Sequence, residues 1–204
     1  MPASASARYL SAVRVTAALT LVLLFLTGCG INAIPTLEER ANAAWSEVLN
    51  QYQRRTDLVP NLVEVVKGFA AQEREVLTQV TEARSRVAQM QIPPDITSNP
   101  EAFRRFQENQ QALGGALSRL IATVEAYPDL RSSENFLTLQ AQLEGTENRI
   151  AVARRDYIEA VRAYNTELRT IPGRWWAAIF YPDAQPMQNF AIEEEAQAAP
   201  QVRF

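Results

Sequence analysis

Apolar residues recur at three- and four-residue spacing along most of the chain, which is the period of an α-helix with one buried face. The pattern begins at Leu37, and Pro60 separates its first stripe from a second one. Either Pro60 kinks one long helix, or it lies in the first turn of a new helix with Asp57 near its cap; we favour the long kinked helix. The first stripe consists of Leu37, Ala41, Ala44, Trp45, Val48, Leu49 and Tyr52, and the second of Leu62, Val66, Phe69, Val76, Val80, Ala83 and Val87.

A proline-rich break at residues 92–95 precedes the next helix. Asn99 followed by Pro100 predicts a helix start, with the asparagine as N-cap and the proline in the first turn. Residues 127–130 (Tyr-Pro-Asp-Leu) end this helix. Its predicted inward face consists of Phe103, Phe106, Leu113, Leu117, Leu120 and Val124.

The last long helix is expected to be capped by Ser132 or Ser133 and to run to about Ile171, where Pro172-Gly173 stops it. Polar residues interrupt its inward stripe. The stripe consists of Phe136, Gln140, Leu143, Glu147, Ile150, Arg154, Tyr157, Val161, Tyr164, Leu168 and Ile171.

Glu147 and Arg154 are the charged members of that stripe, and buried charges are costly unless they are paired. Partners are therefore expected on neighbouring helices. We favour the interpretation that these residues set the register of the helices; the alternative is a polar site inside the bundle. The candidate partners are Arg54, Arg55, Asp57, Glu64 and Glu73.

These patterns predict an all-α protein without strands. Helices joined by short proline-containing loops pack antiparallel to their neighbours. We expect an elongated, antiparallel, up-and-down bundle of three to four long helices over residues 37–172. Residues 173–204 should form a short aromatic segment and an acidic tail. The aromatic residues 174–181 are expected to fold back and close one end of the bundle; the alternative is that they face a membrane interface or a partner groove.

The first 28 residues are typical of a secretory signal peptide, with two arginines before an apolar run at residues 15–26 and small residues before Cys29. Leu26-Thr27-Gly28-Cys29 resembles the lipobox of bacterial lipoproteins, which predicts cleavage before Cys29 and lipid attached to its thiol. Residues 29–36 would then be a lipidated anchor and linker. An uncleaved membrane-spanning helix is the alternative, but the strongly apolar run is about 12 residues long, where a span needs roughly 20.

The composition excludes most common catalytic chemistry. The chain has no histidine and a single cysteine, which excludes Ser-His triads, histidine-ligated metals, thiolate zinc clusters and an intrachain disulfide. Glu64, Glu73 and Glu75 could be read as carboxylate metal ligands, but di-iron bundles pair glutamate with histidine. We expect no cofactor, no metal and no catalytic residue. The net charge of −3 and the lack of a long basic run argue against nucleic acid as a partner.

Two long sequence blocks resemble the LemA family. The first includes residues 54–63 (RRTDLVPNLV), and the second includes residues 127–130 (YPDL) and 144–157 (EGTENRIAVARRDY). The resemblance implies an amino-terminal membrane anchor and an extracytoplasmic helical domain with bromodomain-like topology. It carries over no catalytic residues. Family members are often encoded beside TPM-domain proteins or a membrane zinc metalloprotease, which suggests such proteins as partners.

The functional expectation is a non-enzymatic scaffold or adaptor in the cell envelope, anchored by lipid on Cys29, facing the periplasm and binding another envelope protein. Gly30, where an aspartate would signal retention, favours the outer over the inner membrane. One alternative is a self-assembling structural protein at the membrane surface, which would be a homo-oligomer. Another is an enzyme that acts on envelope glycans with paired carboxylates.

Overall fold

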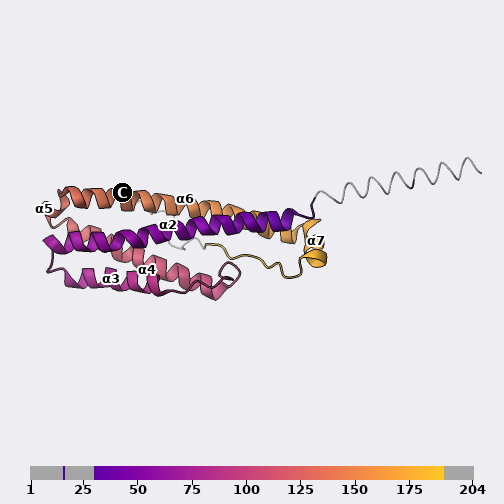
Figure 1. Cartoon of the computed structure of the whole chain (residues 1–204), viewed down its shortest axis with the longest axis horizontal. Coiled ribbons are helices and arrows are strands. Elements are labelled where there is room, and N and C mark those ends of the chain that lie inside the picture. Colours follow the sequence, from indigo (N-terminus) through magenta and orange to yellow (C-terminus); the bar gives the residue numbers. More distant parts are fainter. Residues whose placement is uncertain (1–15, 17–29, 191–204) are drawn as a thin grey trace, which may run out of the picture.

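The computed structural model describes residue 16 and residues 30–190 of the 204-residue chain. The main part is an elongated bundle in which every regular element is a helix, as predicted (Figure 1). Apart from residue 16, the predicted signal peptide lies outside the described residues, as do Cys29 and the acidic tail from residue 191. The helices are α2 (Ala33–Phe69), α3 (Arg74–Gln89), α4 (Pro100–Val124), α5 (Pro128–Arg131), α6 (Glu134–Arg169) and α7 (Gly173–Phe180).

The two longest helices, α2 and α6, pack against each other along the bundle, and α3 and α4 form a second pair beside them (Figure 1). With 37 residues, α2 is roughly 55 Å long at the α-helical rise. Two apolar clusters fill the interior. One lies around Trp45, Phe106 and Tyr157, and the other joins Val66 of α2 to Leu113 of α4.

Pro60 lies inside α2, which continues unbroken through it. The favoured interpretation, one long helix, is therefore confirmed. A proline has no N–H, so the carbonyl of the residue four positions earlier loses its helical partner. That residue is Thr56, and its carbonyl accepts a hydrogen bond of 3.3 Å from Nε of Arg84 on α3. The Thr56 carbonyl, which lacks a hydrogen-bond donor within α2, thus forms a contact between α2 and α3.

This arrangement predicts a coupling between Arg84 and Pro60. Arg84→Ala is expected to lower the free energy of unfolding by about 1 kcal/mol, the typical net value of one hydrogen bond. In a Pro60→Ala background the cost should fall, because the N–H of the new alanine satisfies Thr56. A double-mutant cycle by urea denaturation measures the coupling, with the exposed Arg86→Ala as control. Equal costs in both backgrounds would contradict this account.

The second predicted stripe, from Leu62 to Val87, is wrong as a single register. The helix ends at Phe69, the chain turns at residues 70–73, and α3 returns alongside α2. Phe69, predicted inward, is exposed. Apolar residues of two antiparallel helices face one core here, and periodicity along the sequence does not distinguish that from one continuous stripe.

The predicted start of the bundle at Leu37 is also corrected. Helix α2 already begins at Ala33, and Ile34 is completely buried. Residues 33–36, predicted as linker, therefore belong to the bundle. A buried residue in the first turn anchors the helix start, even though the stripe there is too short to be recognised in the sequence.

The predicted caps of the later helices are confirmed. The side-chain oxygen of Asn99 accepts a hydrogen bond of 3.1 Å from the N–H of Ala102, and Pro100 opens α4. Ser133, one of the two predicted caps of α6, accepts a bond of 3.3 Å from the N–H of Phe136. The whole predicted inward face of α4 is buried.

After α7 the chain runs back along the bundle as an extended segment, drawn in yellow in Figure 1. The side chain of Asn165 on α6 binds the main chain of this segment. Its amide nitrogen donates to the Met187 carbonyl at 2.8 Å, and its amide oxygen accepts from the Met187 N–H at 2.9 Å. The hydroxyl of Tyr157 donates to the Gln188 carbonyl at 2.9 Å. Phe190, the last described residue of the segment, is buried against Trp45 and Tyr157 in the core. The segment thus completes the aromatic core.

Candidate functional site

The most connected polar side chain of the interior is Arg55 on α2, which is only 4% exposed. Its Nη1 donates to both carboxylate oxygens of Glu147 on α6, at 3.2 and 3.4 Å. Its Nη2 donates to the Gln110 carbonyl and side-chain oxygens on α4, at 2.9 and 2.7 Å. The guanidinium also lies over the Tyr52 ring, 4.9 Å from its centroid. One side chain therefore joins three helices.

Arg55, one of the five candidate partners, does pair with Glu147, but the expected burial is reversed. Glu147 has a side chain that is 45% exposed, whereas the buried charge is Arg55. An arginine buries more readily than a carboxylate because its charge is delocalised and weakly hydrated. The sequence does indicate that Arg55 lies on the buried face of α2, because it follows Tyr52 by three residues and precedes Val59 by four.

Arg154, the other predicted seam charge, is half-buried and lies over the Phe190 ring, 4.6 Å from its centroid. Arg154 thus contacts an aromatic ring of the returning segment rather than a carboxylate of a neighbouring helix. Ile171, the last predicted member of the stripe, is exposed because α6 ends at Arg169. Sequence periodicity could not reveal Phe190, since it lies outside any helix.

The remaining predicted carboxylate candidates lie apart and each contacts an ordinary surface partner. Glu64 pairs with Lys67 at 3.8 Å, the Glu73 carboxylate accepts from the Tyr127 hydroxyl at 2.6 Å, and Glu75 accepts from Gln79 at 3.2 Å. In the described part of the chain, no three acidic or cysteine side chains converge in a way that could hold a metal ion.

The buried tyrosines remain protonated at neutral pH. Loss of hydration on burial raises the pKa of Tyr164 to about 12, with the charge of Glu38 adding to the effect. Burial likewise raises the pKa of Tyr157 and of Tyr52. Desolvation disfavours the phenolate. The Tyr157 hydroxyl, which donates to the Gln188 carbonyl, therefore keeps its proton at neutral pH.

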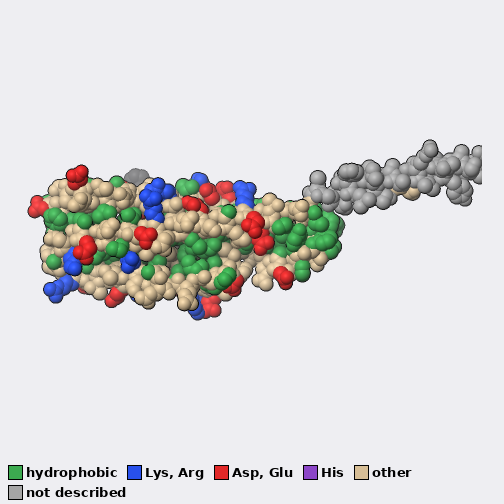
Figure 2. Space-filling model, viewed as in Figure 1, with side chains coloured by type: hydrophobic (Ala, Val, Ile, Leu, Met, Phe, Trp, Pro, Cys, Tyr) green, Lys and Arg blue, Asp and Glu red, His purple; other side chains and the backbone are tan. Residues whose placement is uncertain are grey.

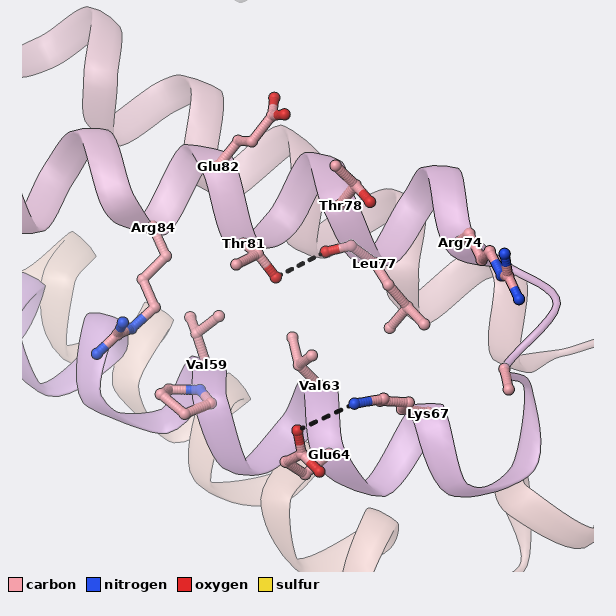
Figure 3. A pocket seen from close by; sticks show the side chains of 12 residues that line it. Val59, Val63, Glu64, Lys67, Arg74, Leu77, Thr78, Thr81, Glu82 and Arg84 are labelled. Carbon is pink, nitrogen blue, oxygen red and sulfur yellow. Dashed lines mark hydrogen bonds and ion pairs between the residues drawn. The ribbon is translucent and has the colours of Figure 1, made fainter.

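A groove of about 690 Å³ opens between the second half of α2 and α3 (Figure 3). Val59, Val63 and Leu77 point toward one another from the two helices and form an apolar floor. Charged side chains of both signs surround this floor. They are Glu64, Lys67, Arg74, Glu82 and Arg84. The arrangement is suited to a ligand with an apolar face and polar edges.

A second apolar surface lies at the opposite end of the bundle, on α7 (Figures 1 and 2). Trp175, Ile179 and Phe180 are each more than half exposed. On the other side of α7, Trp176 and Ala177 pack against the core. The predicted closure of the bundle end is therefore correct for one face of this helix, whereas the other face is exposed.

Gly173, the first residue of α7, allows the main chain of α7 to lie against the main chain of α6. A Cβ at Gly173 would overlap the main-chain carbonyl oxygen of Glu167.

None of the helices in the described residues is both long and apolar enough to cross a membrane.

Comparison with known proteins identifies relatives of the bundle. A family model described as the LemA family matches residues 44–204. Magnetosome protein MamQ 2 of Paramagnetospirillum magneticum is 28% identical over 164 residues, and magnetosome protein MamQ of Magnetospirillum gryphiswaldense is 27% identical over the same length. In both cases the match covers 72% of this chain and only 60% of the relative.

Proposed function

Because the chain belongs to the LemA family, we propose that it is a lipid-anchored, non-enzymatic adaptor that binds another protein of the cell envelope. Family membership and the similarity to the MamQ magnetosome proteins support a membrane-associated protein without enzymatic activity. The lipobox pattern at Cys29 supports lipid as the anchor, and Gly30 supports the outer membrane over the inner membrane. The bundle would then face the periplasm.

The groove between α2 and α3 carries the proposal. Helix α2 starts at Ala33, four residues after the proposed anchor, and the groove begins at Val59. At the α-helical rise this separates the groove from the start of the helix by roughly 40 Å. This geometry would hold a bound partner at a distance from the lipid that retains the adaptor.

The groove chemistry supports an amphipathic helix as the partner segment. Val59, Val63 and Leu77 provide apolar contacts along a channel that runs between two antiparallel helices. Helices bind such grooves through apolar residues spaced three and four apart. The rim, with Glu64 and Lys67 on α2, would pair with charges at the edges of the partner helix. TPM-domain proteins and membrane metalloproteases are the partner classes to test first.

Crosslinking in living cells tests this function at the groove itself. A photoreactive amino acid at Thr78, which is exposed in the groove, should capture one defined envelope protein. The same amino acid at Glu159, exposed on α6 outside the groove, is the matched control and should not capture it. Val63→Glu, which places a charge in the apolar floor, should lower the captured amount about tenfold.

Each outcome separates the possible functions. Capture that is equal at both positions, or unaffected by Val63→Glu, overturns the groove as the binding site. Captured copies of the chain itself would favour the self-assembling structural protein. Mass spectrometry of the amino-terminal peptide from the same sample tests the anchor. A chain that still begins at Met1 and carries no lipid on Cys29 would refute it.

A further inference from the structure

Large exposed apolar side chains gather on the outer face of α7. Trp175 and Ile179 are four residues apart and therefore lie on one side of the helix. Phe180 and Ile171, which precedes α7, extend the same exposed region. Arg174 is the single charged residue within α7. A contiguous patch of this kind usually marks a binding surface.

This patch lies directly beside the point where the chain enters the bundle. The main chain at Gly30 lies against α7, because a Cβ on Gly30 would be 3.3 Å from Nε1 of Trp176. Helices α2 and α7 also contact each other at this end. Cys29, the proposed lipidation site, is the residue immediately before Gly30. Lipid on Cys29 would therefore bring the bilayer surface to α7.

The composition of the patch matches the boundary between water and hydrocarbon. Tryptophan is enriched at that boundary because it combines a large apolar ring with a polar N–H. Short amphipathic helices bind there with their apolar side inserted and their polar side toward water. On α7 the inner side is already held by Trp176 and Ala177, which pack against the core. Insertion of the outer side thus requires no rearrangement of the bundle.

We propose that the outer face of α7, centred on Trp175 and Ile179, inserts into the lipid interface next to the acylated Cys29. This inference rests on the proposed lipid anchor and adds a second, protein-borne contact to it. Two contacts restrict the tilt of the bundle, whereas the lipid alone would let it rotate. The groove between α2 and α3 would then be presented in a defined direction.

Fluorescence quenching by brominated lipid tests the insertion. The full-length acylated protein is reconstituted into phosphatidylethanolamine–phosphatidylglycerol vesicles whose acyl chains carry bromine near the headgroup. The chain has three tryptophans, and Trp45 is buried in the core as an unquenched background. Trp175→Phe is expected to reduce the quenched fraction at least about twofold, because Trp175 is the residue proposed at the interface. Trp176→Phe, which removes the inward-facing neighbour, is the matched control and should change it less.

Flotation of the same vesicles distinguishes the inference from the function on which it rests. Protein that floats with the vesicles but shows no quenching at Trp175 overturns the insertion and leaves the anchor intact. Protein that does not float overturns both. A Trp175→Cys variant tests for a second copy of the chain on this face. Efficient disulfide-linked dimers in the vesicles, with no quenching in the parent protein, would assign the patch to self-association and refute insertion.

Discussion

Arg55→Ala is expected to lower the free energy of unfolding by about 1–3 kcal/mol, the cost of leaving a buried hydrogen-bonding group without its partner. The substitution removes the donors that satisfy Gln110 on α4 and Glu147 on α6. Gln110 is itself buried, so its side-chain oxygen would be left without the donor that satisfies it. Glu147 can recover hydration because it is half-exposed.

Arg54→Ala provides the matched control for this prediction. Arg54 is the preceding residue of the same helix but is exposed, and its loss should change stability by no more than about 0.5 kcal/mol. Urea denaturation followed by circular dichroism measures both variants. Equal, small effects would mean that Arg55 does not connect the helices. Arg55→Lys should recover little, because an ammonium group cannot reach Gln110 and Glu147 with the same planar fork.

Trp45→Ala is expected to have a larger effect, lowering the free energy of unfolding by about 3–5 kcal/mol through the cavity that it leaves. The Trp45 indole lies between rings of α4, α6 and the returning segment, with centroid distances of 5.1 Å to Phe106, 5.3 Å to Tyr157 and 6.2 Å to Phe190. Several elements would lose a common contact, so the cavity cannot close by moving one side chain.

The same variant should also loosen the returning segment. Phe190 loses one of the rings against which it packs, so limited proteolysis after residue 181 should become faster than in the parent protein. Trp175→Ala is the control, because that tryptophan is mostly exposed on α7 and its removal leaves no cavity. A Trp45→Ala protein with unchanged stability and unchanged protease resistance would show that the aromatic cluster is not a unit of stability.

Much of the fold could be predicted from residue patterns because helix signals are local. Asn99-Pro100 and Ser133 mark helix starts through hydrogen bonds within one turn, and both starts are found where predicted. The buried stripe of α4 follows from its spacing alone. The same local signals were insufficient at residues 70–73, where apolar residues of two helices follow the same period on both sides of a turn.

The candidate surfaces needed the tertiary structure. Glu147 was recognised as a charge in an apolar seam, and Arg55 was one of its predicted partners. Which of the two is buried depends on the packing of three helices around Arg55. The groove between α2 and α3 exists only because α3 turns back beside α2.

Residue patterns alone predicted the family, the all-helical class, most helix starts and the apolar faces, because these depend on residues a few positions apart. The packing of the helices showed in addition that Arg55 joins three helices, that Phe190 returns to the core, and that α7 has a buried and an exposed face. Each of these depends on residues far apart in the chain. Which distant residues are buried together or paired depends on how whole helices pack. The spacing of residues along the sequence does not encode such contacts.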